Sequence, residues 1–130
     1  MIEVKYGLLP KENFCKYFEF LINKTYKILP LKEEKSDTLK SYLESYLREL
    51  IGNQELVSVL VNEPKFITLL NTMQFLISKE YSDKVCKKEV FKCIRILEEI
   101  KEKYFKEDWF VWIDILQEWL NMVLLRESEL

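Results

Sequence analysis

The chain of 130 residues contains no histidine and no alanine, and it has only two glycines and three prolines. Without histidine, the serine-histidine and cysteine-histidine nucleophile pairs, the imidazole zinc sites and the Glu-x-x-His di-iron sites are excluded. Two glycines cannot supply a Walker loop or a dinucleotide-binding fingerprint, and the sequence has no DxDxDG calcium loop. We therefore expect a protein that is not an enzyme and that has no catalytic residues, no metal site and no cofactor.

The scarcity of glycine and proline also bears on the fold, because an all-β protein needs many turns. The length suggests one domain, and a composition of 48% apolar and 32% charged residues is typical of a globular protein. The formal net charge is only −2, with 17 lysines but three arginines. A charge this close to zero does not favour nucleic acid or an anionic membrane as the main partner.

The three cysteines, Cys15, Cys86 and Cys93, are odd in number and have no paired-motif spacing. On one helix, Cys86 and Cys93 would lie about 10.5 Å apart along the axis, too far for a disulfide. The pattern predicts buried free thiols in a reducing compartment. The first ten residues lack the basic segment and apolar core of a signal peptide. We expect a cytoplasmic protein.

Apolar residues recur every three or four positions along most of the chain, which is the period of an amphipathic helix. The pattern predicts helices over residues 11–29, 36–51, 54–61, 64–78, 82–105 and 109–125. Pro30 and Gly52 are expected to end the first two helices, and Ser36 or Asp37 to begin the second. Pro64, Ser82 and Asp108 are expected at the starts of the last three helices.

The two ends of the chain differ from this pattern. Residues 2–6 alternate as in a strand, but no second strand is evident, so we expect an extended arm over residues 1–10. Residues 126–130 are expected to fray. The sequence as a whole predicts an all-α, single-domain bundle of five or six helices over residues 1–130, with a Trp-rich and mostly buried C-terminal helix.

The segment 109–125 is the most apolar part of the chain, with three tryptophans among its seventeen residues. Its only polar residues are Asp114, Gln117, Glu118 and Asn121, and their spacing places them on one narrow side of a helix. Such a helix must be buried, by its own chain or by another molecule. The acidic residues near its middle argue against a membrane span, and its polar edge lacks the lysine and arginine of a membrane-surface helix. We expect no membrane partner.

This helix is expected to have two apolar faces. The face expected in the core consists of Trp112, Ile113, Leu116, Leu120 and Val123. The face expected to bind a partner consists of Phe110, Ile115, Trp119 and Met122. Tryptophan is enriched at the energetic centres of interfaces, so another protein, or a second copy in a homodimer, would cover the second face. The alternative is an ordinary core helix that its own chain covers completely.

A basic stripe on the expected 82–105 helix is a second candidate site. It consists of Lys84, Lys87, Lys88, Lys92 and Arg95. Four of these residues share one face, and a basic helical stripe can lie along phosphates. However, arginine occurs in it once, and Phe91 is the only aromatic residue interleaved for stacking. An ordinary solvated face has the same appearance, so nucleic-acid binding is the alternative interpretation.

These features predict a non-catalytic protein-interaction module, an inhibitor or regulator that binds another protein. Small, lysine-rich, glycine-poor helical proteins commonly serve as inhibitors, immunity proteins, antitoxins and phage-encoded modulators, which is an analogy of size and composition. The alternative is a nucleic-acid-associated regulator that uses the basic stripe. An apolar ligand bound in a pocket is a third and more distant expectation.

Overall fold

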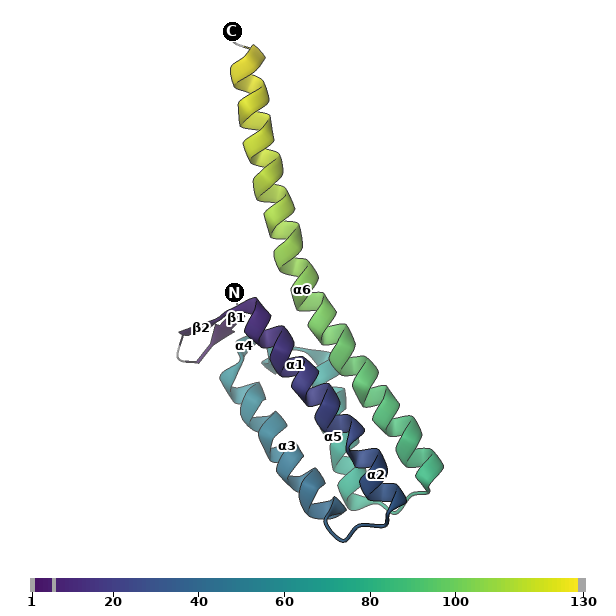
Figure 1. Cartoon of the computed structure of the whole chain (residues 1–130). Coiled ribbons are helices and arrows are strands. Elements are labelled where there is room, and N and C mark those ends of the chain that lie inside the picture. The colour runs from purple at the N-terminus through teal and green to yellow at the C-terminus, as the bar shows by residue number, and fades with distance from the viewer. Residues whose placement is uncertain (1, 6, 129–130) are drawn as a thin grey trace.

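The computed structural model describes the backbone of residues 2–5 and 7–128, and the side chains of residues 2–5, 7–104 and 116–124. This part of the chain forms six helices and one two-stranded antiparallel hairpin (Figure 1). In chain order the elements are β1 (Ile2–Val4), β2 (Gly7–Leu9), α1 (Lys11–Tyr26), α2 (Ile28–Glu33), α3 (Leu39–Leu56), α4 (Ser58–Val61), α5 (Pro64–Ser78) and α6 (Asp83–Ser128).

Four long helices, α1, α3, α5 and α6, run alternately in opposite directions, and the short helices α2 and α4 lie at opposite ends of the bundle (Figure 1). Helix α6 packs against α1, α2 and α5, and α3 packs against α5. Short connections favour this antiparallel arrangement of neighbours. The prediction of a helical bundle is confirmed.

The core is built from the apolar faces that the helical period predicts. The face of α6 that packs inward is buried and consists of Cys86, Val90, Cys93, Leu97, Ile100 and Tyr104. On α1, Phe14 and Phe18 are buried with their ring centroids 4.5 Å apart. The Tyr104 ring meets Phe14 edge-on at 5.7 Å, which joins the two helices at the end of the bundle where α1 begins.

The N-terminal residues form a hairpin, so the expectation of an extended arm with no second strand is wrong. Ile2 pairs with Leu9, and Gly7 adopts a φ of +151°, which favours glycine at the turn. The Lys5 N–H donates a 2.8 Å hydrogen bond to the Leu56 carbonyl, which attaches the hairpin to the end of α3. The second strand escapes prediction because it is only three residues long and does not alternate.

Two predicted helix ends differ in the structure. Pro30 lies in the first turn of α2, where the missing N–H costs nothing because helical N–H groups there have no partner. Gly52 lies inside α3, which continues to Leu56. The helix stops at Val57, which has extended backbone angles and forms a bridge with Val4 of the hairpin.

The predicted helix starts are partly confirmed. Pro64 is the first residue of α5, and the Ser82 hydroxyl accepts a 3.2 Å hydrogen bond from the Val85 N–H at the start of α6. Helix α3 begins later than expected, with Thr38 rather than Ser36 or Asp37 at its N-cap position. The Ser36 hydroxyl instead accepts a hydrogen bond from the Thr38 N–H, in the turn before the helix.

Helix α6 is continuous, so no separate helix begins at Asp108. No glycine or proline interrupts it, and a continuous helix keeps its backbone N–H and C=O groups paired. The helix extends past the end of the bundle (Figure 1). The prediction of a mostly buried C-terminal helix is therefore wrong for its described side chains, because the body that would bury them ends before they begin.

Candidate functional site

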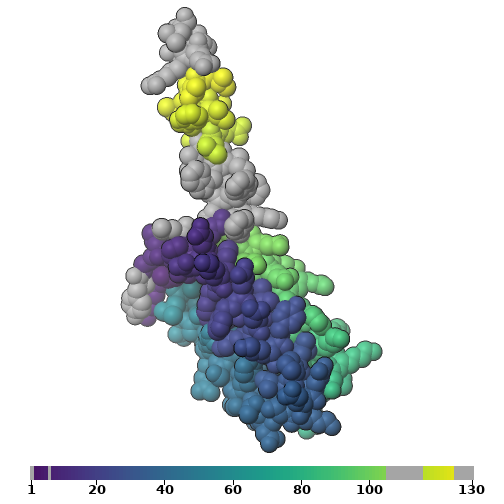
Figure 2. Space-filling model, in the orientation of Figure 1, coloured from purple at the N-terminus to yellow at the C-terminus, as the bar shows by residue number. Residues whose placement is uncertain are grey.

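The described side chains at the end of α6, residues 116–124, form what we call the C-terminal apolar segment. In Figure 2 it stands away from the body, in yellow. Trp119 is 60% exposed and Met122 is 63% exposed. At 100° per residue, the apolar positions cover an arc of roughly 200° around the helix. Gln117, Glu118 and Asn121 occupy the remainder, so the segment is amphipathic with a wide apolar face.

The expected core face of this helix is not buried where its side chains are described, and the expected partner face stays a prediction. Leu116 and Leu120, expected in the core, are 50% and 52% exposed. Val123 is half-buried. The side chains of the remaining predicted residues, Phe110, Trp112, Ile113 and Ile115, lie outside the described part of the chain. Trp119 and Met122 are accessible to a partner, together with the two leucines.

The basic stripe lies on the outward side of α6, opposite the buried cysteines. The structure leaves all five of its members exposed: Lys84, Lys87, Lys88, Lys92 and Arg95. Glu89 reaches Lys92 with a 3.7 Å ion pair and reduces the positive charge of the stripe near its middle. Phe91 is also exposed, and its ring meets Tyr26 of α1 edge-on at 6.2 Å.

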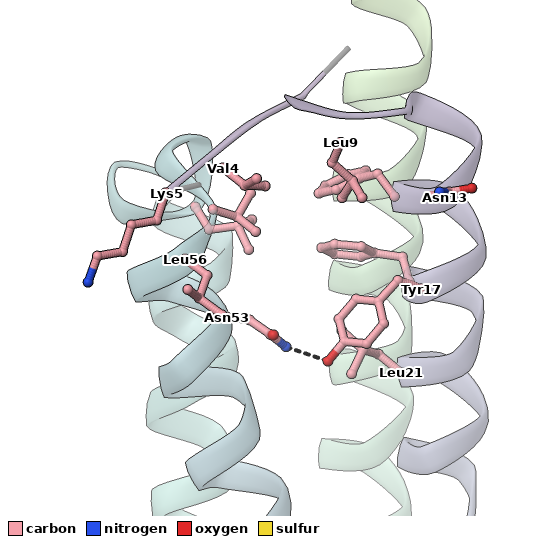
Figure 3. Close-up of a pocket in the computed structure, with 12 residues that line it drawn as sticks. Val4, Lys5, Leu9, Asn13, Tyr17, Leu21, Asn53 and Leu56 are labelled. Atoms are coloured by element: carbon pink, nitrogen blue, oxygen red, sulfur yellow. Dashed lines mark hydrogen bonds between the residues drawn. The ribbon is translucent and has the colours of Figure 1, made fainter. Parts of the chain in front are cut away.

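A pocket that sequence reasoning did not locate lies between α1 and α3, beneath the hairpin (Figure 3). Its volume is about 470 Å³, within the roughly 300–1,000 Å³ of small-molecule pockets. The apolar lining includes Val4, Leu9, Phe14, Phe18, Leu56 and Val57. Because these residues belong to the hairpin, α1 and the end of α3, no local sequence pattern brings them together.

One end of the pocket carries a polar network that joins α1 to α3. The Asn53 side chain donates a 2.6 Å hydrogen bond from Nδ2 to the Tyr17 hydroxyl, drawn as a dashed line in Figure 3. The Tyr17 hydroxyl donates a 2.8 Å hydrogen bond to Glu49 Oε1. The other carboxylate oxygen of Glu49 pairs with Lys24 Nζ. These four side chains therefore form one continuous chain of hydrogen bonds.

The surroundings of this network keep the Tyr17 hydroxyl protonated and the Glu49 carboxyl ionised. Burial of the hydroxyl, opposed by the Asn53 hydrogen bond and reinforced by Glu49, raises the pKa of Tyr17 to about 12. Burial acts to raise the pKa of Glu49, but hydrogen bonds from Lys24 and Tyr17 outweigh it and lower that pKa below the ordinary 4.5. At neutral pH, Tyr17 is therefore a neutral donor and Glu49 is a charged acceptor.

Within the described part of the chain, no group of three or more histidine, cysteine, aspartate and glutamate side chains is arranged to hold a metal ion. Among the same residues, no helix has both the length and the apolar character needed to span a membrane.

Comparison of the chain with protein-family models, curated proteins and solved structures found no match. The candidate functional sites of the described chain are therefore the two exposed surfaces of α6 and the pocket.

Proposed function

We propose that this protein is a non-catalytic protein-interaction module, an inhibitor or regulator whose C-terminal apolar segment binds another protein. The observation that carries the proposal is the exposure of Trp119 and its apolar neighbours on a helix that extends past its own bundle. Soluble monomers rarely expose contiguous apolar patches larger than a few hundred Å². A partner that covers the segment would remove its apolar side chains from water, which is favourable.

The spacing within the segment supports a helix or a helix-binding groove as the partner surface. Leu116, Trp119, Leu120 and Val123 lie at positions i, i+3, i+4 and i+7, the pattern with which an amphipathic helix enters an apolar groove. A buried tryptophan removes roughly 150–250 Å² from water, so Trp119 is the expected energetic centre. A second copy of this chain presents the same apolar pattern and is the simplest candidate partner.

Sedimentation equilibrium tests the second copy directly. If the segment self-associates, the wild type forms dimers that Trp119→Glu dissociates, while Asn121→Glu, on the polar side of the same turn, leaves them intact. A wild type that stays monomeric at high concentration would exclude the homodimer.

A photo-crosslinker placed at one position tests any other protein partner. The benzoylphenylalanine side chain replaces Trp119 in one variant and Asn121 in a control, and both are irradiated in the source cell. The proposal expects a discrete adduct from position 119 and little from position 121. Equal crosslinking at both positions, or none at either, would contradict it.

The site of action that we propose is the cytoplasm. Cys86 and Cys93 are buried free thiols, which is the state expected in a reducing compartment.

A nucleic-acid-associated regulator is the second proposal, and the joint exposure of the five basic residues on α6 supports it. Its test is the triple substitution of Lys84, Lys88 and Lys92 by glutamate. Binding of DNA or RNA with a steep salt dependence that this variant abolishes would favour the second proposal over the first.

A further inference from the structure

The hydrogen bonds at the polar end of the pocket have only one possible direction. An ionised Glu49 carboxylate accepts and never donates, so Lys24 and Tyr17 must both donate to it. Because the Tyr17 proton is used in this way, its oxygen must accept from Asn53. The Asn53 carboxamide is therefore oriented with Nδ2 toward Tyr17, at 2.6 Å.

This orientation leaves hydrogen-bonding capacity on Asn53. A carboxamide has two N–H donors and one carbonyl oxygen that can accept twice. Among the described residues, Asn53 makes one side-chain hydrogen bond, through a single N–H to Tyr17. Its Oδ1 and its second N–H are both available, on a half-buried side chain that lines the pocket.

The charges around the pocket select against an ionised ligand, since Lys5 is the one charged residue of the described lining and its side chain points away from the cavity in Figure 3. The positive charge of Lys24 is paired with Glu49, and Tyr17 is neutral, so the network has no net charge to neutralise a ligand ion. A ligand carboxylate placed beside Asn53 would also lose its hydration and would lie near the Glu49 carboxylate. A neutral group that both donates and accepts fits the free atoms of Asn53 without either cost.

We propose that the pocket binds a small neutral amphipathic molecule, an aliphatic chain that ends in a hydroxyl or carboxamide group. The polar group would bond to the Asn53 carboxamide, and the chain would lie against Phe14, Leu56 and the hairpin. The hairpin is held over the pocket by the Val4–Val57 bridge and by the hydrogen bond from the Lys5 N–H to Leu56. This ligand site lies between α1 and α3 and is separate from the C-terminal apolar segment.

Isothermal titration calorimetry with 1-octanol tests the ligand class. The wild type is expected to bind 1-octanol at a single saturable site and to bind octanoate at pH 8 at least about tenfold more weakly, because a buried charge loses its hydration. Asn53→Leu should lower the affinity for 1-octanol by roughly two- to tenfold, the effect of one lost hydrogen bond. Equal binding of octanol and octanoate, or an unchanged affinity in Asn53→Leu, would overturn the proposed chemistry.

A pair of tryptophan variants tests the location. Leu56→Trp places a larger side chain in the pocket and should abolish octanol binding. Ile67→Trp is the control, because Ile67 is an exposed residue of α5 that does not line the pocket, and this variant should bind octanol normally. If Leu56→Trp fails to fold, wild-type nuclear Overhauser effects from the octanol chain to the rings of Phe14 and Tyr17 decide the matter. The absence of these Overhauser effects would overturn the proposal. Loss of octanol binding in Trp119→Glu would also overturn it, because octanol would then bind to the C-terminal apolar segment.

Discussion

The Tyr104 hydroxyl donates a 3.0 Å hydrogen bond to Glu63 Oε2, which joins α6 to the residue that precedes α5. Glu63 is only 4% exposed, and the same oxygen accepts a 2.8 Å hydrogen bond from Lys103. Tyr104 is also the last buried side chain described on α6. The carboxylate therefore anchors the helix close to the point where it leaves the bundle, and it supports the extension that carries Trp119.

Glu63→Ala should destabilise the protein more than the loss of a surface ion pair would. The substitution removes the charged acceptor of the hydrogen bonds from Tyr104 and Lys103, and a hydrogen bond to a charged group contributes about 1.5–3 kcal/mol to the free energy of unfolding. Glu99→Ala is the matched control, because Glu99 forms an exposed 2.9 Å pair with Lys65, and such pairs contribute about 0–1 kcal/mol. Urea denaturation of the two variants measures both values, and equal losses would contradict the anchoring role.

The stability of the protein should fall in acid partly because of Glu63. Burial acts to raise the pKa of this carboxyl, but hydrogen bonds from Lys103 and Tyr104 outweigh it and lower the pKa below the ordinary 4.5. A carboxyl with a lowered folded-state pKa stabilises the fold fully above pH 4.5, and that stabilisation is lost as the pH falls through the folded-state pKa.

Denaturation curves collected from pH 7 to pH 3 test this expectation on the wild type and Glu63→Gln. The difference in unfolding free energy between the two proteins should be constant above pH 4.5 and should shrink below it. A difference that stays constant to pH 3 would show that Glu63 does not titrate with folding.

The buried face of α6 was predictable because the sequence pattern that defines it lies within one short stretch of the chain. Cys86, Val90, Cys93 and Leu97 repeat at three or four positions, and that period alone places them on one side of a helix. The exposure of the Trp-rich segment was not predictable in the same way. A helix that is apolar nearly all round must be covered, but the pattern does not say whether its own chain or another molecule covers it.

The pocket could not be predicted from the sequence for a different reason. Tyr17 and Asn53 are separated by 36 positions, and each is an ordinary polar residue on its own helix. Only the packing of α1 beside α3 brings them to 2.6 Å. The hairpin above them depends on a bridge between Val4 and Val57, which neither local alternation nor a turn motif indicates.

Leu116→Ala and Leu97→Ala should differ sharply in their effect on folding. Leu116 is half exposed, so the loss of its side chain should change the unfolding free energy by less than about 0.5 kcal/mol. Leu97 is fully buried, and a leucine-to-alanine change in a core costs about 2–5 kcal/mol. Thermal melts at concentrations low enough to keep the protein monomeric separate the two cases. A large loss for Leu116→Ala under these conditions would mean that the bundle covers the segment.

The three thiols should react with Ellman's reagent in two phases. The thiolate is the reactive form, and burial raises the pKa of Cys93 to about 12 and also raises the pKa of Cys86. Cys15 is only half-buried and should react first. Cys86 and Cys93 should react only as the protein unfolds, at rates that increase with urea. Rapid reaction of all three thiols in native buffer would contradict the packing of α6.

Gly52→Ala should stabilise the protein. A glycine that ends a helix in the left-handed conformation resists replacement, and the sequence alone suggests that role for Gly52. In the structure, however, Gly52 lies inside α3, its φ is not positive, and a Cβ added there would have no neighbour within 4 Å. Alanine in a helix interior is favoured over glycine by roughly 0.5–1 kcal/mol, so the free energy of unfolding should rise by about that amount.

Gly7→Ala is the control, because it should act in the opposite direction. A Cβ at Gly7 would also meet no atom within 4 Å, so crowding does not distinguish the two sites. The difference is the backbone, since Gly7 has a φ of +151°, which strains any residue with a side chain. Urea denaturation should therefore show a gain for Gly52→Ala and a loss for Gly7→Ala. A loss at both positions would mean that α3 ends at Gly52, and that Asn53 does not continue the helix toward the pocket.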